Sequence, residues 1–145
     1  CNWGGVRNSS LMQMPLKLTL KPGEKFVLNG GVLINGDRRA DLIIENQVSL
    51  LRERDVLQAN DANTPVKRIY FSIMMMYLDG GLESGYYSDF TEIMTDFMSI
   101  LSSTDALAKC QRILDEVHQL RFYTALMTCK SLLPFEKERL EYVVQ

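Results

Sequence analysis

Residues 16–36 read LKLTLKPGEKFVLNGGVLING and decide the fold of the first half of the chain. In LKLTLK, leucine alternates with lysine or threonine, and a period of two is typical of a strand with one apolar face. Three turn signals follow, and the middle one, Asn29-Gly30-Gly31, favours a type I′ hairpin. We expect five short antiparallel strands, at residues 16–21, 25–28, 32–34, 39–44 and 47–51. Such close spacing indicates a meander or small barrel, because βαβ units need long crossovers.

From residue 63 onward the pattern becomes helical. Thr64 places a capping hydroxyl before Pro65, which predicts a helix that runs to Tyr77 and stops at Asp79-Gly80-Gly81. Ser88 is expected to cap a second helix. Further helices are expected from Thr104 to about Leu132 and over residues 135–144, interrupted by Pro134. The predicted class is therefore α+β, an N-terminal antiparallel β-meander or small barrel followed by a C-terminal bundle of three to four helices.

The chain is expected to have three parts. Residues 1–13 lack the basic start and apolar stretch of a signal peptide, and we expect a leader that is disordered or foreign to the natural chain. Residues 14–64 form the β-rich region, and residues 65–145 form the α-helical region. The 145 residues suffice for one domain or two small lobes.

Composition excludes several classes of protein. Hydrophobic residues make up 46% and charged residues 23%, as in folded globular proteins. No apolar run approaches the ~18 residues of a transmembrane helix, so no membrane contact is expected. Three cysteines cannot all pair, which favours a reducing compartment, and we expect a cytoplasmic protein.

The sequence does not indicate an enzyme. Its single histidine, His118, has no nucleophile at motif spacing, although Cys110 and Cys129 flank it. There is no Cys-x-x-Cys for zinc, and Asn29-Gly30-Gly31 lacks the Gly-Lys-Ser/Thr ending of a phosphate loop. We therefore expect no catalytic residues, no metal and no cofactor.

Charge differs between the two halves. Residues 14–68 carry nine bases and seven acids, whereas residues 69–145 carry six bases and eleven acids. A polyanion would thus prefer the sheet-rich half, where strand periodicity places Lys17, Thr19 and Lys21 on one face. The alternative is an ordinary solvated face whose cations guard an edge strand. The candidate nucleic-acid contacts are Lys17, Thr19, Lys21, Arg38, Arg39, Arg52 and Arg54.

Two further groups are candidates for partner binding. Met74-Met75-Met76 offers an adaptable surface, or else belongs to a buried helix. Tyr86 and Tyr87, beside glycines, can stack on bases or anchor their loop onto the core. The candidate partner contacts are Met74, Met75, Tyr86 and Tyr87.

A resemblance to a known family runs through most of the chain. The strings MPLKLTLKPGEKFVLNGGVLINGDRRA (14–40), VSLLRE (48–53), ANTP (62–65) and RIYFSIMMMYL (68–78) resemble the FlbT family of flagellum biosynthesis repressors. The resemblance implies a post-transcriptional repressor that associates with the 5′ untranslated region of flagellin mRNA and promotes its degradation. It also implies a role in flagellum assembly opposed to the activator FlaF.

Short stretches of the β-rich region also resemble a second family, and this likeness bears on how RNA would be bound. Leu18-Thr19, Gly23-Glu24, Val48-Ser49 and Arg52-Glu53 look like the carbon storage regulator family, CsrA. In that family, the first strand of one chain lies beside the last strand of another, and together they grip a GGA loop. The likeness implies an RNA face made by Leu18, Thr19 and Lys21 with Arg52. Leu20 departs from it, because that family has an arginine there.

The RNA-binding interpretation predicts both an RNA partner and a second copy of the chain. Four or five cations on one face would bind RNA moderately, so we expect a homodimer or larger assembly on the flagellin mRNA leader. The alternative is a protein-interaction module or chaperone-like regulator that binds a flagellar protein through its acidic helices, with an indirect effect on mRNA.

Overall fold

A computed structural model describes residues 16–46 and 48–144, with side chains up to residue 139. The expected leader, residues 1–13, lies outside the described residues. The chain divides into two compact units, one ending at Val56 and the other beginning at Leu57. They are called the β unit and the helical unit.

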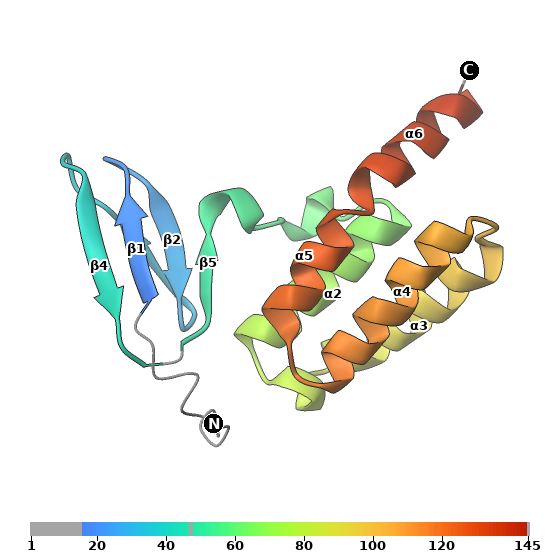
Figure 1. The fold of residues 1–145 in the computed structure, drawn as a ribbon, viewed down its shortest axis with the longest axis horizontal. Helices are drawn as coiled ribbons and strands as arrows, with labels where there is room; N and C mark the ends of the chain where they lie inside the picture. The colour runs from blue at the N-terminus through green and yellow to red at the C-terminus, as the bar shows by residue number, and fades with distance from the viewer. Residues whose placement is uncertain (1–15, 47, 145) are drawn as a thin grey trace. The chain divides into compact units, whose positions relative to one another are not determined.

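Within residues 16–46 and 48–56, five antiparallel strands build the β unit, as the sequence predicts. They form two small sheets, one of β1 and β4 and one in the order β3-β2-β5, so only β2 and β3 are neighbours both in sequence and in a sheet. Figure 1 shows β4 beside β1. The bounds are β1 Leu16–Leu20, β2 Lys25–Leu28, β3 Gly31–Ile34, β4 Ala40–Ile44 and β5 Leu50–Arg52.

The β2–β3 hairpin turns through Asn29 and Gly30. Both residues have positive φ, 49° and 86°, as a type I′ turn requires, so the predicted turn is confirmed. Two of the three alternating leucines of β1, Leu18 and Leu20, are buried with Phe26 as expected, whereas Leu16 is exposed. Leu28, Ile44 and Leu50 pack against this small core. The two sheets therefore share one apolar interior.

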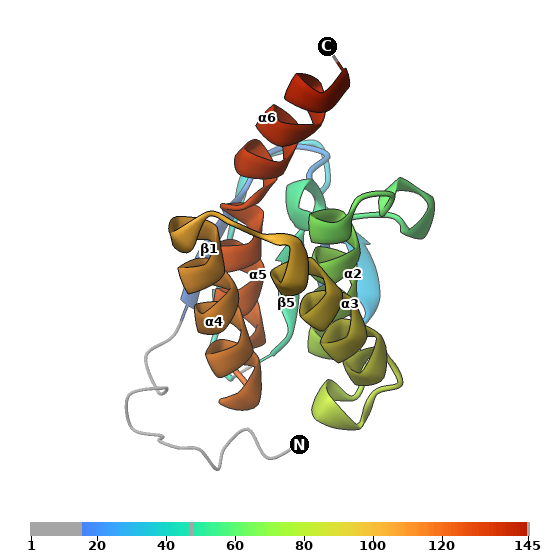
Figure 2. The ribbon, with the colours of Figure 1, turned by 90° about the vertical axis from the view of Figure 1, so that its right-hand side faces the viewer.

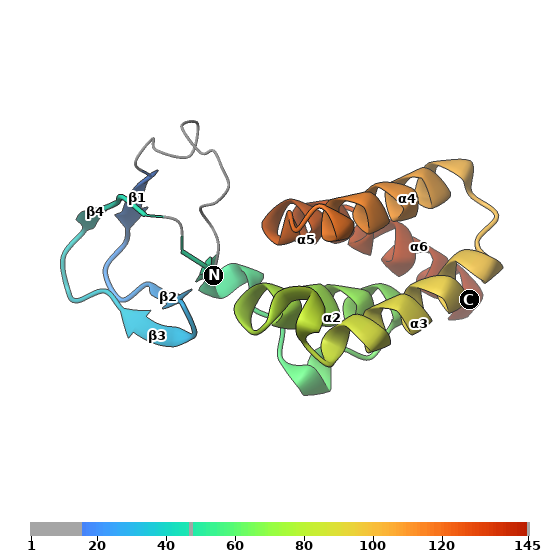
Figure 3. The ribbon, with the colours of Figure 1, turned by 90° about the horizontal axis from the view of Figure 1, so that it is seen from below.

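Five α-helices follow in the helical unit. Figures 2 and 3 show α2 lying along α3 and α4 lying along α5. None of the described helices is long and apolar enough to span a membrane. The bounds are α2 Pro65–Leu78, α3 Tyr86–Ile100, α4 Thr104–His118, α5 Phe122–Lys130 and α6 Leu133–Val144. Short 3-10 helices occupy Glu53–Asp55 in the β unit and Ala59–Asp61 and Gly81–Glu83 in the helical unit. The predicted α+β class is thereby confirmed.

The long helix predicted from Thr104 to Leu132 is wrong, because the chain reverses between α4 and α5. At the end of α4, Arg121 N–H donates to the Glu116 carbonyl and Leu120 N–H donates to the Val117 carbonyl. This is a Schellman motif, with Leu120 at φ 64° in the place where glycine is usual. The reversal lays α5 back along α4.

Two helix starts also differ from expectation. The second helix begins at Tyr86 and not after Ser88, because the Ser84 hydroxyl accepts from the Tyr86 N–H at 3.0 Å. The last helix begins at Leu133 and accommodates Pro134 in its first turn, where a missing N–H costs nothing.

The N-terminus of α2 is hydrogen-bonded to Glu136 of α6, near the other end of the chain. Thr64 caps the helix as predicted, accepting from the Lys67 N–H at 3.3 Å. The buried Glu136 of α6 accepts from both the Thr64 hydroxyl and the Val66 N–H, the latter at 2.9 Å. A carboxylate at the positive end of a helix is stabilising, so Glu136 ties α6 to α2.

Candidate nucleic-acid interface

On the outer face of β1, Lys17 and the Thr19 hydroxyl both interact with the Asp41 carboxylate. Thr19 lies directly opposite Asp41 in the β1–β4 register. Its hydroxyl donates to Asp41 Oδ1 at 2.9 Å, and Lys17 Nζ is 3.8 Å from Asp41 Oδ2. The Lys17 side chain is 65% exposed, so this ion pair is weak in energy. It nevertheless offsets the charge that Lys17 would offer to a polyanion.

The Arg52 guanidinium is largely buried and bonded to other groups of the β unit. Its Nη1 donates to Glu24 Oε2 at 2.5 Å, and its Nη2 donates to the Thr19 carbonyl at 3.3 Å. The two side chains are only 24% and 20% exposed. The CsrA likeness implies strands of two chains and an RNA face that includes Leu18. Here Arg52 meets β1 of its own chain, Leu18 is buried, and Arg52 forms a clasp between the two sheets.

Glu24 is the acceptor at the centre of this clasp. Its Oε1 accepts from the Lys21 N–H at 2.9 Å, while its Oε2 accepts from Arg52. The Lys21 N–H first, and then the Arg52 guanidinium, hold the pKa of Glu24 below its ordinary value. The carboxylate therefore stays charged at neutral pH and keeps Arg52 in place.

A second set of cations lies on two loops that one asparagine ties together. Asn35 Nδ2 donates to the carbonyls of Lys21 and Arg38, both at 2.8 Å. The Gly23 N–H donates to the carbonyls of Asn35 and Gly36 at 3.1 and 2.9 Å. These bonds place the loop after β1 against the loop before β4. We call the pair the stapled loops, residues 21–24 and 35–39.

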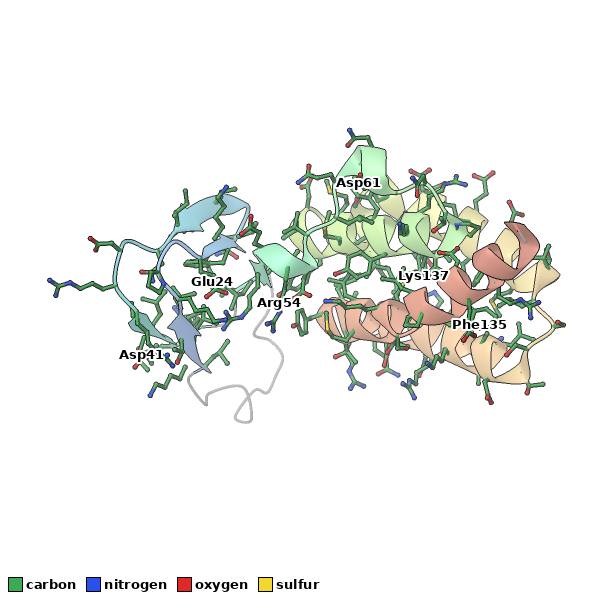
Figure 4. All side chains as sticks on the ribbon, turned by 90° about the horizontal axis from the view of Figure 1, so that it is seen from above. Glu24, Asp41, Arg54, Asp61, Phe135 and Lys137 are labelled. Carbon is green, nitrogen blue, oxygen red and sulfur yellow. The ribbon has the colours of Figure 1, made fainter. Side chains whose placement is uncertain are left out.

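The stapled loops carry exposed cations. Lys21, Arg38 and Arg39 are all exposed, and within the described part of the chain none of them forms a salt bridge. Figure 4 shows Glu24 and Asp41, the two carboxylates that hold Arg52 and Lys17, within the same unit. Arg54 is exposed too, but it lies apart in sequence, in the short helix Glu53–Asp55. The seven candidates thus separate into a clasped set (Lys17, Thr19, Arg52) and an open set (Lys21, Arg38, Arg39, Arg54).

Sequence reasoning missed two residues of this surface. Asn35 was seen only as part of a turn signal, although its amide makes the bonds that join the loops. Lys25 was left out, yet it is exposed at the start of β2, opposite Ile34, at the same end of the β unit. An Asn-Gly-Asp turn whose asparagine can reach neighbouring carbonyls is the signal that could have found Asn35.

Most of the candidate partner contacts pack against other residues of the helical unit. Met74 is buried, and its sulfur accepts from the Leu57 N–H at 3.5 Å, whereas Met75 is half-buried. Tyr86 meets Phe71 edge-on, with ring centroids 6.0 Å apart. Tyr87 stacks on Phe90 at 6.4 Å, and its hydroxyl is 3.0 Å from His118 Nε2. These contacts favour the anchoring role over base stacking.

An open hollow lies beside Tyr86, between α2 and α3. Its volume is about 290 Å³, and its lining includes Arg68, Phe71 and Asp89. Its charged lining has two acids, Asp89 and Glu92, against Arg68, which disfavours a polyanion there.

The two thiols of the helical unit, Cys110 and Cys129, are buried. Burial raises the pKa of Cys110 to about 11, and burial likewise raises the pKa of Cys129. Both stay protonated at neutral pH, so neither supplies the thiolate that nucleophilic catalysis needs. Among the described residues, no three His, Cys, Asp or Glu side chains are placed to hold a metal ion.

Comparison with known proteins agrees with the resemblance seen in the sequence. The family model described as "Flagellar protein FlbT" matches residues 16–140. The chain belongs to the FlbT family. The match spans both the β unit and the helical unit, so the clasp, the stapled loops and the helical core all lie within the FlbT region.

Named relatives of the FlbT family cover almost all of the chain. A probable flagellum biosynthesis repressor protein FlbT from Caulobacter sp. (strain K31) is 48% identical over 130 residues, 90% of this chain and 99% of that protein. The flagellum biosynthesis repressor protein FlbT of Caulobacter vibrioides (strain ATCC 19089 / CIP 103742 / CB 15) is 45% identical over 130 residues, 90% of this chain and 92% of that protein. A Rhodopseudomonas palustris (strain TIE-1) relative is 32% identical, over 88% and 98% of the two chains. No solved structure matches the chain.

Proposed function

We propose that this protein is a post-transcriptional repressor of flagellin synthesis that acts in the cytoplasm. It binds the 5′ untranslated region of flagellin mRNA through the β unit and promotes degradation of that mRNA. Membership of the FlbT family supports the repressor role in flagellum biosynthesis. The stapled loops are the observation that supports contact with RNA.

Three exposed cations of the β unit form no salt bridge with any described residue. Lys21, Arg38 and Arg39 project from two loops whose backbones Asn35 holds together. A positioned set of cations displaces counterions from RNA phosphates, and this release drives binding. Arginine adds a planar fork that can pair with phosphate oxygens or stack on unpaired bases.

The clasped residues have a different role in this mechanism. Arg52, Glu24 and the Thr19 carbonyl join the second sheet to β1 and to the first of the stapled loops. They position the loop that carries Lys21, and their charges already compensate each other. Replacing Arg52 would therefore weaken RNA binding through the fold and not through a lost phosphate contact.

Degradation of the mRNA falls to cellular nucleases in this proposal. The buried, protonated thiols and the Tyr87-bonded His118 offer no assembled catalytic group in the described residues. Binding in the untranslated region would block translation and leave the message open to decay.

Charge removal on the stapled loops tests the proposal. Lys21, Arg38 and Arg39 are changed together to glutamine, and binding of fluorescent flagellin leader RNA is followed by anisotropy. We expect the dissociation constant to rise about tenfold or more, since each removed cation leaves a phosphate uncompensated. Lys137→Gln, at an exposed site on α6, is the control and should bind as the parent chain does. Equal binding by the parent and the triple variant would contradict the site.

The second candidate function is a protein-interaction module in the helical unit. The hollow between α2 and α3, with Tyr86 at its side, is the observation that favours it. Failure of the parent chain to bind leader RNA even at low salt would make this candidate the better one.

A further inference from the structure

The edge strand β3 is the most exposed apolar strand of the β unit. All four of its residues, Gly31–Ile34, are exposed, and Val32 and Ile34 show 68% and 62% of their surface to solvent. Figure 3 shows β3 beside β2, and among the strands of the described residues, in the order β3-β2-β5, it has a neighbour on one side only. An exposed apolar edge of this kind is a template for pairing with another strand.

The hydrogen-bond pattern shows which backbone groups of β3 make no bond to β2. The Asn35 N–H donates to the Glu24 carbonyl, and from this pair the alternation of an antiparallel ladder makes Phe26–Leu33 and Leu28–Gly31 the bonded pairs. The N–H and C=O groups of Val32 and Ile34 therefore point away from β2. They form two donors and two acceptors along the open edge.

The other edge strands of the β unit carry charge. Lys17 stands on β1, Asp41 on β4 and Arg52 on β5. Charged residues on an edge discourage pairing with another chain, because pairing would bury or oppose them. β3, with the sequence GVLI, has neither a charge nor a proline. It is the strand of this unit that pairs at least cost.

We infer that β3 pairs antiparallel with β3 of a second copy of this chain across a two-fold axis. In the register that joins the free groups, Val32 faces Ile34 of the second copy and Leu33 faces Leu33 of the second copy. The four free donors and acceptors of each strand are then used, and the two three-stranded sheets become one six-stranded sheet. Every side chain on the two facing strands is apolar or glycine.

Self-pairing fits this strand better than pairing with another edge. A β3–β4 contact would set Asp41 beside apolar side chains and would be head-to-tail, so it would leave a free edge at each end. The two-fold β3 contact closes on itself. It buries much less than the ~1,200 Å² of a standard interface, so the dimer is weak and depends on protein concentration.

Sedimentation equilibrium without RNA tests this inference separately from the proposed function. The parent chain should pass from monomer to dimer as its concentration rises from low to high micromolar. Ile34→Lys should weaken the dimer at least about tenfold, because a charge would face apolar residues in the contact. Ile43→Lys, at a comparably exposed site on β4 (57%), is the matched control and should dimerise as the parent does. A parent chain that stays monomeric, or equal effects of the two lysines, would overturn the inference.

Cross-linking tests the register. Leu33 lies on the two-fold axis in a non-bonded pair, where cysteines approach within disulfide range, whereas Ile34 does not face itself. With Cys1 replaced by serine, Leu33→Cys should form covalent dimers under mild oxidation, well above the yield of Ile34→Cys or Ile43→Cys. Equal yields from the three variants would contradict the two-fold register.

Discussion

At the scale of single residues, polar groups decide which cations of the β unit are available. Lys17 and Arg52 were predicted as RNA contacts from strand periodicity, but that pattern cannot show which carboxylate each will meet. Glu24 compensates Arg52 in a largely buried pair, whereas Asp41 lies near Lys17 in an exposed and weaker one. The exposed positions Lys21, Arg38 and Arg39 stay on the candidate surface.

Glu24 makes the stability of the β unit depend on pH. Its pKa is lowered in the folded chain, so the folded state binds its proton less readily than the unfolded state does. The resulting stabilisation is complete above the ordinary pKa of 4.5 and is lost as pH falls through the folded value. Urea unfolding between pH 7 and pH 3 should show this loss, and Glu24→Gln should flatten it. An unchanged pH profile in Glu24→Gln would contradict the clasp.

Asn35 should matter for both stability and RNA binding although it carries no charge. Asn35→Ala removes the bonds to the Lys21 and Arg38 carbonyls and should lower the free energy of unfolding by about 1–2 kcal/mol. It should also weaken RNA binding, because the two loops lose their fixed spacing. Asn46→Ala, at an exposed turn, is the control for both measurements. If both variants bind RNA as the parent does, the staple has no part in the interface.

At the scale of elements, local signals predicted most of the strands and helices, and contacts distant in sequence explain the exceptions. The Asn29-Gly30 turn and the Thr64-Pro65 helix start needed only their own residues, and both are confirmed. The break after α4 was missed because Leu120 takes the left-handed conformation where a glycine would have signalled it. The buried partner of the α2 cap, Glu136, lies beyond the range of any local pattern.

Glu136 should be the most sensitive carboxylate of the helical unit. Glu136→Ala leaves the Val66 N–H and the Thr64 hydroxyl without their acceptor and should cost about 2–3 kcal/mol of unfolding free energy. Glu138→Ala, exposed on the same helix, controls for helix propensity and should cost little. Urea denaturation followed by circular dichroism measures both. A cost for Glu136→Ala no larger than for Glu138→Ala would show that the cap does not stabilise α2.

At the scale of the whole molecule, the sequence predicted the α+β class and the family, but not how the strands share sheets. A meander joins consecutive strands, whereas here β1 pairs with β4 and β2 pairs with β5. Both pairings depend on tertiary packing around Leu18, Leu20 and Phe26, which periodicity within one strand cannot reveal. This arrangement brings the loops before β2 and β4 together and so creates the candidate interface.

The salt dependence of leader RNA binding is the decisive measurement for the stapled loops as an RNA interface. In anisotropy titrations of the parent chain, the logarithm of the binding constant should fall linearly with the logarithm of salt concentration. The triple glutamine variant at Lys21, Arg38 and Arg39 should show a slope shallower by about 2, since each single-strand phosphate contact contributes about 0.7. We predict this difference in slope together with native circular dichroism spectra for both proteins. A flat salt response in the parent, or equal slopes in the two proteins, would contradict it.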